Sequence, residues 1–395
     1  MDSLLEGVRI LDLTRVLAGP YASMVLADLG AEVIKVELPS SGDESRGFGP
    51  FQNGESAYFT SVNRGKKSVT IDLRQGRGRD LALGLAETCD VLVENFRPGS
   101  MDRFGLGYET VHAKYPQLVY ASISGFGQTG PYAQRPAYDV LIQAMGGLAS
   151  ITGEPNSPPV RVGSSIADLS AALFGAVGIL AALQRASRTG EGQQIDISML
   201  DCQVALLENA LARYAVSGEV PQPLGSRHPA ITPFQFFAVS DGHIVLAAGN
   251  DGLWRKLCTA LDLLDLIEDS RFADNALRTE NHAALEPLLA EVLADKTVAE
   301  WCEVLVQAGV PSGPLCDVGE VFNDEQIAAR EMIVEIDHPI AGRQAMPNSP
   351  LKFSQTPIQL LRPAPLLGQH TEEVLRDMLD LGTDEITGLR ADGVI

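Results

Sequence analysis

An aspartate stands at the start of the most apolar stretch of the chain. The sequence Ser165-Ile166-Ala167-Asp168 leads into a run that stays almost entirely apolar as far as Gln184, which predicts a helix over 166–184 that is buried on all sides. One interpretation is a capping box, with Ser165 as the N-cap and Asp168 three residues later. The other is a carboxylate nucleophile at a helix N-terminus, where the helix dipole favours the ionised form by about 0.3–1 kcal/mol. The residues alone leave both interpretations open, and the two are compatible.

Two further segments also have an ordinary and a functional interpretation. Tyr138-Asp139 stands at the start of a helix predicted over 138–150, where a packed tyrosine and an N-cap aspartate are the ordinary expectation. Gly249-Asn250-Asp251-Gly252 follows a predicted strand, and such sequences commonly form a turn. The functional alternative for this second segment is a mobile loop that covers an active site.

Two short basic turns border predicted strands. They are Asn63-Arg64-Gly65-Lys66-Lys67-Ser68 and Glu94-Asn95-Phe96-Arg97-Pro98-Gly99, with Arg103 close behind the second. The chain has a net charge of −21, so an anionic ligand must find a local basic patch against an unfavourable overall field. Because ligands of open parallel sheets bind at the strand ends, this placement favours a phosphate-rich ligand.

Several classes of function are excluded by motif and composition. Gly125-Phe126-Gly127-Gln128-Thr129-Gly130 matches the GxGxxG pattern, but Pro131 follows it and the first strand–helix turn has Ala18-Gly19-Pro20, so we exclude a bound NAD. The five cysteines include no CxxC pair and no HExxH motif is present, so we expect neither a metal site nor disulfides. An acidic chain without a dense Lys/Arg tract is not expected to bind nucleic acid. No signal peptide is visible, and we expect a cytoplasmic protein without a membrane segment.

The first half of the chain alternates strand and helix patterns. Strands are predicted over 8–13, 32–37, 68–73, 91–94, 118–124 and 193–198, and helices over 21–29, 79–88, 138–150, 166–184 and 200–216. This alternation predicts an α/β fold with a doubly wound parallel sheet.

The pattern changes after a Pro-rich linker at 221–233. The runs 234–239 and 243–248 flank Ser240-Asp241-Gly242 and predict a hairpin, and helical patterns follow to about Ala308. A small α+β domain is therefore expected. From Val310 we expect Pro-rich loops, then a helix over 371–379 and a short polar tail.

Taken together, these segments resemble the family III CoA-transferases, of the formyl-CoA and carnitine type. The stretches that carry the resemblance, besides the two basic turns and the helix of Asp168, are Leu11-Asp12-Leu13-Thr14, Ala18-Gly19-Pro20, Leu29-Gly30-Ala31-Glu32-Val33-Ile34-Lys35-Val36-Glu37, Gly125-Phe126-Gly127 and Gly130-Pro131. The resemblance implies a Rossmann-like large domain made of 1–220 and 330–395, a small domain of 221–329, and a homodimer of two interlocked, ring-like subunits.

The resemblance also implies roles for individual residues. Asp168 falls on the family's nucleophile, which takes up CoA through aspartyl anhydride and aspartyl-CoA thioester intermediates. Positions that contact CoA are Val16, Leu73, Arg74, Asn95, Phe96 and Arg103, and positions near the substrate or on its covering loop are Tyr138, Asp139, Gly249, Asn250 and Asp251. Coenzyme A enters as a substrate, in acyl-CoA, and neither a metal nor a permanently bound cofactor is implied.

Two departures from the formyl-CoA transferases bear on the substrate. Those enzymes carry a glutamine at the position of Leu17 and a run of glycines where this chain has Gly249-Asn250-Asp251-Gly252. We therefore expect the branch that uses longer dicarboxylic acids such as succinate and glutarate, with succinyl-CoA as donor, rather than oxalate or formate chemistry.

Two rivals share the scaffold. The α-methylacyl-CoA racemases place a histidine beside an aspartate where this chain has Tyr138-Asp139, and a tyrosine, with an ordinary pKa of about 10, is a poor proton shuttle at neutral pH. A non-catalytic acyl-CoA-binding protein is the second rival, and the presence of Asp168 argues against it.

Overall fold

The computed structural model describes residues 3–360 and 362–395, which form two compact units. The large unit comprises the chain up to Leu148, Arg161–Ala212 and Gln326–Ile395, and the small unit comprises Ala149–Val160 and Arg213–Glu325. The segment 149–160, which the sequence analysis placed within the large domain, makes its contacts in the small unit.

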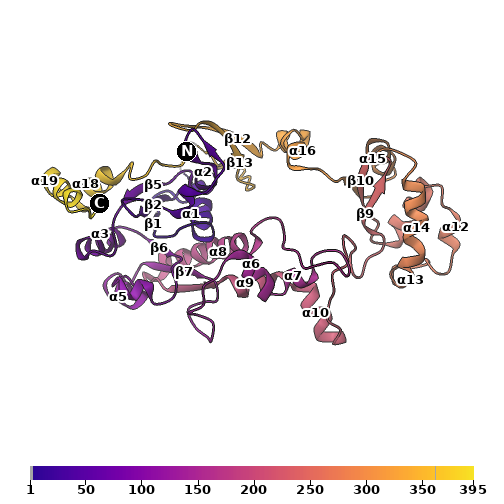
Figure 1. The fold of residues 1–395 in the computed structure, drawn as a ribbon, viewed down its shortest axis with the longest axis horizontal. Helices are drawn as coiled ribbons and strands as arrows, with labels where there is room; N and C mark the ends of the chain where they lie inside the picture. The colour runs from indigo at the N-terminus through magenta and orange to yellow at the C-terminus, as the bar shows by residue number, and fades with distance from the viewer. Residues whose placement is uncertain (1–2, 361) are drawn as a thin grey trace. The chain divides into compact units, whose positions relative to one another are not determined.

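A six-stranded parallel sheet forms the centre of the large unit (Figure 1). Its strands are β1 Arg9–Asp12, β2 Glu32–Glu37, β5 Lys67–Thr70, β6 Val91–Glu94, β7 Val119–Ser124 and β8 Gln194–Ser198. They lie in the order β5-β2-β1-β6-β7-β8, and each neighbouring pair is parallel. Counted within this sheet the order is 3-2-1-4-5-6, so the direction of winding reverses between β1 and β6. The predicted α/β fold with a parallel sheet is confirmed.

Helices cover both faces of this sheet. Along β1, Ile10 packs into one buried cluster with α1 (Ala18–Asp28) and α8 (Ile166–Thr189), whereas the next residue, Leu11, packs into the other. The second cluster contains residues of α3 (Gly76–Glu87), α5 (Tyr108–Lys114), α18 (Thr371–Leu379) and α19 (Thr383–Ala391). Figure 1 shows α18 and α19 beside the N-terminal elements. The expected polar tail is therefore wrong, because α19 buries Ile386 and Leu389.

One face of α8 is solvent-exposed. Ala167 and Ala171 are fully buried against the sheet, but Leu173, Phe174 and Val177 are 51%, 47% and 64% exposed. The prediction of burial on all sides is wrong, since an apolar sequence does not reveal what covers each face. Within the described residues, α8 is the one helix whose length and composition would allow it to cross a membrane, a test that core helices also pass.

The remaining elements of the large unit include several that the sequence analysis missed. Those missed include the short helix η1 (Glu44–Gly47), the strands β3 (Phe51–Gln52) and β4 (Glu55–Ser56), and the helices α2 (Ala57–Asn63), α4 (Ser100–Arg103) and α17 (Glu325–Ala329). The helices α6 (Asp139–Met145) and α9 (Met199–Leu206) overlap the helices predicted over 138–150 and 200–216. A hairpin of β12 (Ile333–His338) and β13 (Gly342–Pro347) stands where Pro-rich loops were expected. The predicted helix over 138–150 is divided by Gly146-Gly147 into α6 and α7 (Leu148–Ile151).

The small unit has its own sheet and core. Its antiparallel sheet, of order β11-β10-β9, contains β9 (Phe234–Val239), β10 (Gly242–Ala247) and β11 (Ser312–Pro314). Its helices are α10 (Glu208–Ser217, which begins within the large unit), α11 (Asp251–Ala260), α12 (Asp265–Glu268), α13 (Asn275–Glu280), α14 (His282–Leu293), α15 (Val298–Gln307) and α16 (Val318–Phe322). Trp254 and Trp301 are fully buried between them, and the predicted hairpin of β9 and β10 is present.

Candidate functional site

The carboxylate of Asp168 is uncommitted. It lies in the first turn of α8, half-buried, and makes no hydrogen bond or ion pair with the described residues. Burial and the negative charge of Asp139 raise the pKa of Asp168 to about 7. A side chain that is used only to cap a helix would be paired with backbone N–H groups, so this carboxylate is available for chemistry.

The capping of α8 comes from another helix. Ser165 occupies the N-cap position, but its side chain makes no capping hydrogen bond, so the capping-box interpretation is wrong. Instead Asp139, the first residue of α6, accepts a hydrogen bond from the backbone N–H of Ala167 at 2.9 Å and another from Gln143 Nε2 at 2.7 Å. The expected N-cap role of Asp139 in its own helix is also wrong, because Tyr138 holds that position. Asp139 thus fixes the start of α8 and leaves Asp168 free.

Asp168 lines a cavity of about 180 Å³ in the large unit. The predicted site residues Val16, Asn95, Phe96 and Tyr138 line the same cavity, together with Arg15, Leu17, Ala18, Glu44, Arg97, Pro98, Ile123, Ser124, Gly125, Ala133, Arg135, Pro136, Ala137 and Met199. Val16 follows β1 and Asn95 follows β6, so the cavity lies at the point where the sheet reverses its winding. Tyr138 is 76% exposed, so the expectation of a packed tyrosine is wrong.

The loop between β1 and α1, residues 13–17, forms one wall of this cavity and contains a strained residue. Val16 has φ of +67°, a left-handed conformation that costs a β-branched residue about 1–3 kcal/mol. Its backbone N–H donates to the carboxylate of Asp43 at 3.0 Å. The side chain of Asn95 pairs with both backbone groups of Arg15: Oδ1 accepts from the N–H at 2.9 Å, and Nδ2 donates to the carbonyl at 2.8 Å. Asn95 therefore holds the loop and is itself oriented by it.

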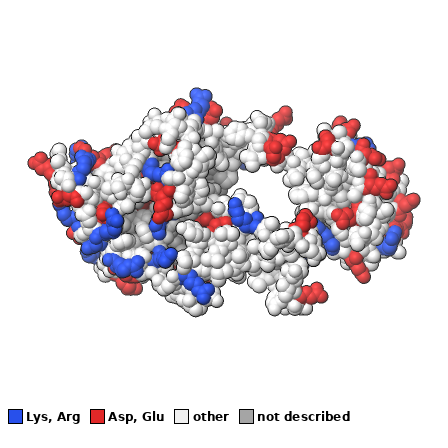
Figure 2. All heavy atoms as spheres, viewed as in Figure 1, with Lys and Arg blue, Asp and Glu red and all other residues white. Residues whose placement is uncertain are grey.

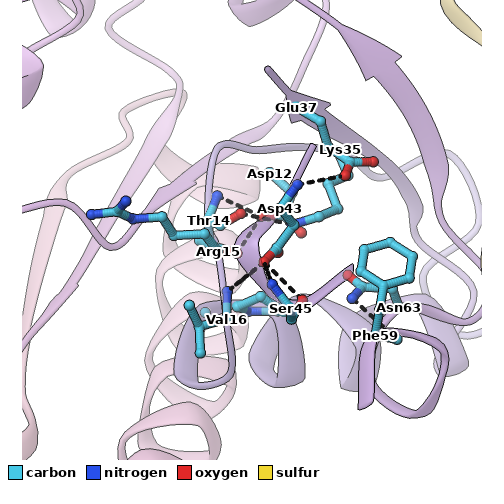
Figure 3. A network of polar contacts seen from close by, with 12 residues as sticks. Asp12, Thr14, Arg15, Val16, Lys35, Glu37, Asp43, Ser45, Phe59 and Asn63 are labelled. Atoms are coloured by element: carbon cyan, nitrogen blue, oxygen red, sulfur yellow. Dashed lines mark hydrogen bonds and ion pairs between the residues drawn. The ribbon is translucent and has the colours of Figure 1, made fainter. Parts of the chain in front are cut away.

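Behind the loop lies a network of buried charges (Figure 3). Lys35 Nζ lies 2.9 Å from Asp43 Oδ2 and donates to the carbonyl of Thr14 at 2.7 Å. Lys66 Nζ lies 3.1 Å from Asp12 Oδ2. Burial opposes the ionisation of both carboxylates, but the two lysines and neighbouring hydroxyl groups outweigh it and hold the pKa values of Asp12 and Asp43 below their usual range. All four charged side chains are buried and paired, so their role is structural.

The other predicted CoA contacts divide into two groups. Leu73 and Arg74 line a second cavity of about 320 Å³, which shares Arg15, Glu44 and Phe96 with the first. Arg74 is paired there with Asp72 at 2.8 Å. Arg103 is exposed, lines neither of these two cavities and donates to Ser100 Oγ at 2.9 Å. The structure therefore brings all the predicted CoA contacts except Arg103 to two adjoining cavities.

Three arginines at the first cavity were not among the predicted site residues. Arg15 is paired with Glu44 at 2.7 Å, whereas Arg97 and Arg135 have no ion-pair partner among the described residues. The guanidinium of Arg135 lies over the ring of Tyr132, 3.8 Å from its centroid. In the view of Figure 2, basic side chains gather over the large unit, while the visible charges of the small unit are mostly acidic. Arg97 lies in the second basic turn, which the sequence analysis associated with a phosphate-rich ligand, whereas Arg15 and Arg135 lie outside both basic turns.

The predicted covering loop lies in the small unit. Asn250 is the N-cap of α11, and its Oδ1 accepts a hydrogen bond from the N–H of Leu253 at 2.9 Å. Asp251 is paired with Arg278 at 2.8 Å, and Gly249 precedes the cap. The expected turn is therefore the N-terminus of a helix, with Asp251 and Gly252 in the first turn of α11, and the role of the segment as a cover stays a prediction.

Comparison with known proteins identifies the family. The family model of CoA-transferase family III matches residues 5–371. The chain belongs to this family. A protein of Mus musculus named succinyl-CoA:glutarate CoA-transferase is 42% identical over 392 residues, which cover 99% of this chain and 90% of that protein. The crystal structure of a CAIB/BAIF family protein from Brucella suis has a TM-score of 0.85 at 41% identity and covers 96% of this chain and 100% of the other.

As a family III CoA-transferase the protein is an enzyme, which confirms the predicted resemblance and removes the non-catalytic rival. A protein of Acetobacter aceti named acetyl-CoA:oxalate CoA-transferase is 44% identical over 350 residues, covering 88% of this chain and 89% of that protein. Relatives of comparable identity are therefore named for acids of different length, glutarate and oxalate, so sequence identity alone does not identify the acid that this transferase uses. Among residues 3–360 and 362–395, no group of three His, Cys, Asp or Glu side chains could hold a metal ion.

Proposed function

We propose that this family III enzyme transfers CoA from succinyl-CoA to a dicarboxylic acid of the glutarate type, with Asp168 as the covalent nucleophile. The observation that carries the proposal is the unpaired, half-buried carboxylate of Asp168 in a cavity at the reversal point of the sheet. The name of the 42% identical mouse relative, succinyl-CoA:glutarate CoA-transferase, supports succinyl-CoA as the donor and glutarate as the type of acceptor.

The proposed reaction alternates two kinds of covalent intermediate. The Asp168 carboxylate attacks the thioester carbonyl and expels CoA thiolate, which gives a mixed anhydride between succinate and the enzyme. The bound thiolate then attacks the aspartyl carbonyl, which releases succinate and leaves an aspartyl-CoA thioester. The acceptor carboxylate attacks this thioester, and CoA thiolate returns to the acyl side of the second anhydride. The products are the new acyl-CoA and the free Asp168 carboxylate, so no net oxidation or hydrolysis occurs.

The start of α1 is suited to stabilise the oxyanions of these steps. Leu17 is the N-cap of α1 and provides no side-chain acceptor, so the N–H groups of Ala18 and Gly19 have neither a side-chain cap nor an intrahelical partner, and Pro20 has no N–H to satisfy. Leu17 and Ala18 line the cavity together with Asp168. Backbone N–H groups placed in this way are the donors that acyl-transfer enzymes use for tetrahedral intermediates.

The unpaired arginines support a dicarboxylic acceptor. One carboxylate of the acid must reach Asp168, and the second requires a cation, which Arg97 and Arg135 offer at the same cavity. We expect Arg135→Gln to raise KM for glutarate about tenfold while KM for a monocarboxylic acid of equal length changes little. Initial rates with succinyl-CoA and both acids measure this, and Arg97→Gln is assayed in parallel. Equal effects of both variants on both acids would assign these arginines to CoA instead.

The nucleophile is tested by trapping. Enzyme incubated with succinyl-CoA and hydroxylamine should form a hydroxamate at Asp168, which peptide mass mapping locates. Asp168→Asn should lower the transfer rate at least about 10⁴-fold while CoA still binds. The matched control is Asp384→Asn, another aspartate in the first turn of a helix, on α19, which should leave the rate unchanged. Transfer by Asp168→Asn at the parent rate contradicts the mechanism.

The exposed apolar face of α8 supports the predicted interlocked homodimer. Leu173, Phe174 and Val177 would be costly to leave in water, and a second copy of the chain would cover them. Val177→Glu should weaken the dimer, as measured by light scattering.

A location in the cytoplasm, free of membrane, is part of the same proposal, because a dimer interface accounts for an apolar helix without a bilayer. Cell fractionation that placed the enzyme in the membrane fraction would contradict it.

A further inference from the structure

Val16 is unusual among the residues with left-handed backbone. In the described part of the chain the other non-glycine residues with positive φ are asparagine, aspartate or glutamate, and Val16 is the only β-branched one. A β-branched side chain strongly disfavours this conformation, so it persists only where surrounding contacts over-determine it. Its position matters, because Val16 lines the Asp168 cavity and immediately precedes Leu17, the N-cap of α1.

Lys35 and Asp43 supply these contacts from both ends of the loop. Asp43 accepts the N–H of Val16 at 3.0 Å, and Lys35 Nζ donates to the carbonyl of Thr14 at 2.7 Å. The two charges are joined at 2.9 Å, and their side chains are 1% and 0% exposed for Asp43 and Lys35. Asp43 also accepts from the N–H and the hydroxyl of Ser45. Figure 3 shows these contacts converging on Asp43 from the β1 loop, Lys35 and Ser45.

We propose that the Lys35–Asp43 ion pair is a positioning device for the reaction at Asp168: it holds Val16 in the left-handed conformation and so directs the first turn of α1 toward the cavity. The inference rests on the proposed function. The Asp43 carboxylate is already occupied by Lys35, Val16 and Ser45, so it acts through the loop rather than on substrate. Without the pair, Val16 relaxes toward an ordinary conformation and carries Leu17 with it.

A double-mutant cycle between Asp43 and Val16 tests this. Asp43→Ala should lower kcat about 5- to 150-fold, the range that corresponds to the strain of one disfavoured residue. Val16→Gly alters the cavity wall, so its own kcat is the reference for the double variant. Glycine adopts positive φ without strain, so the loop of this variant no longer needs Asp43 to hold the conformation. The further loss caused by Asp43→Ala should therefore be at least fivefold smaller in the Val16→Gly background. Equal losses in the two backgrounds would overturn the proposal.

Two additional variants separate positioning from general destabilisation. Asp43→Ala leaves Lys35 unpaired, so Lys35→Met combined with Asp43→Ala removes both charges and should show the same loss of kcat in a folded enzyme. Ser68→Ala removes the hydrogen bonds of the Ser68 hydroxyl with Glu37 at 2.6 Å and with the N–H of Gly368 at 2.9 Å, and it leaves in place the hydrogen bond that Glu37 accepts from the Asp43 N–H and every contact of the Val16 loop. It should lower Tm and leave kcat unchanged. A loss of kcat in Ser68→Ala as large as that in Asp43→Ala would also overturn the proposal.

Amide hydrogen exchange provides a readout that does not depend on catalysis. Exchange of the segment 14–18 should become faster in Asp43→Ala and stay unchanged in Ser68→Ala. If the parent enzyme fails to transfer CoA, the proposed function fails, and exchange still decides whether the pair holds the loop. If the parent transfers CoA but neither the cycle nor the exchange shows coupling, the positioning inference alone fails.

Discussion

Two regions of the large unit use aspartate in opposite ways. Asp12 at the end of β1 and Asp43 at the N-cap of η1 are buried beside Lys66 and Lys35, and these cations hold the pKa values of both carboxyl groups low. At the start of α8, Asp168 is half-buried without a partner, and burial together with Asp139 raises its pKa to about 7. Desolvation opposes ionisation in both regions, and the presence of a paired cation decides the outcome.

The two regions therefore have opposite effects on stability as the pH changes. Asp12, with its lowered pKa, stabilises the fold above its unfolded pKa of about 3.9, and this contribution is lost as the pH falls through its folded value. Asp168, with its raised pKa, has the opposite sign: stability is lost as the pH rises from its unfolded pKa of about 3.9 to its folded pKa of about 7, and the full cost remains above pH 7. Under the proposed mechanism, the cost falls on the carboxylate that reacts and is absent where the carboxylate only holds the loop.

The largest expected effect is on the structural side. Lys66→Met leaves Asp12 buried without its cation, and we expect a loss of about 3–5 kcal/mol in the free energy of unfolding. The neighbouring Lys67 provides the control, because its ion pairs with Glu32 and Glu373 lie near the surface, so Lys67→Met should cost about 0.2–1 kcal/mol. Urea denaturation measures both. Equal losses of stability for the two adjacent lysines would show that the buried ion pair contributes no more than the pairs near the surface.

The second effect concerns catalysis as a function of pH. The proposed nucleophile Asp168 must be ionised, so kcat/KM should be flat above about pH 8 and fall tenfold per pH unit below pH 7, about 100-fold by pH 5. Asp139→Asn removes the neighbouring charge and should shift the midpoint to lower pH. Rates of transfer between pH 4.5 and 9 measure both midpoints, after the stability of each variant over this range is checked. A parent midpoint below pH 5 would mean that Asp168 has an unidentified cationic partner.

The third effect is a gain in stability. Asp168→Asn removes a carboxylate that costs stability when ionised, so the variant should be more stable than the parent at pH 8 by about 1–2 kcal/mol, after allowance for solvent screening of a half-buried group. The raised pKa determines both the direction of this stability difference and the pH range in which it changes. The difference should disappear as the pH falls from 7 toward 4, where Asp168 of the parent becomes protonated. Thermal unfolding at both pH values measures this. A variant less stable than the parent at pH 8 would contradict the assignment of Asp168 as uncommitted.

The parallel sheet could be predicted from sequence because its strands are marked by local patterns. Val91–Glu94 is an apolar run, Glu32–Glu37 contains Val33, Ile34 and Val36 after the turn residue Gly30, and both strands appear as predicted. The hairpin of β12 and β13 was missed because Ile333–His338 lies between Pro-rich segments, which led to the whole stretch being assigned to loops. Local pattern therefore finds central strands more readily than peripheral ones.

The site shows the same limit. The candidate residues Val16, Asn95 and Asp168 could be named from sequence, and they do line one cavity. The contacts that hold these residues in place could not be predicted from sequence. The ion pair of Lys35 with Asp43 and the capping of α8 by Asp139 join residues that have no fixed spacing in the chain. Asp43 and Asp139 look like ordinary turn and cap residues in one dimension. Their function depends on distances that only the folded chain determines.

The smallest expected effect follows from that capping contact. Ser165→Ala should change the free energy of unfolding by less than about 0.5 kcal/mol, although an N-cap serine normally contributes about 1 kcal/mol, because its side chain makes no capping bond here. Asp139→Ala, which removes the acceptor for the Ala167 N–H, should cost about 1–2 kcal/mol. Chemical denaturation of the two variants side by side measures the difference. If Ser165→Ala cost as much as Asp139→Ala, Ser165 would be the cap of α8, and Asp168 would then be a member of the capping box rather than a free carboxylate.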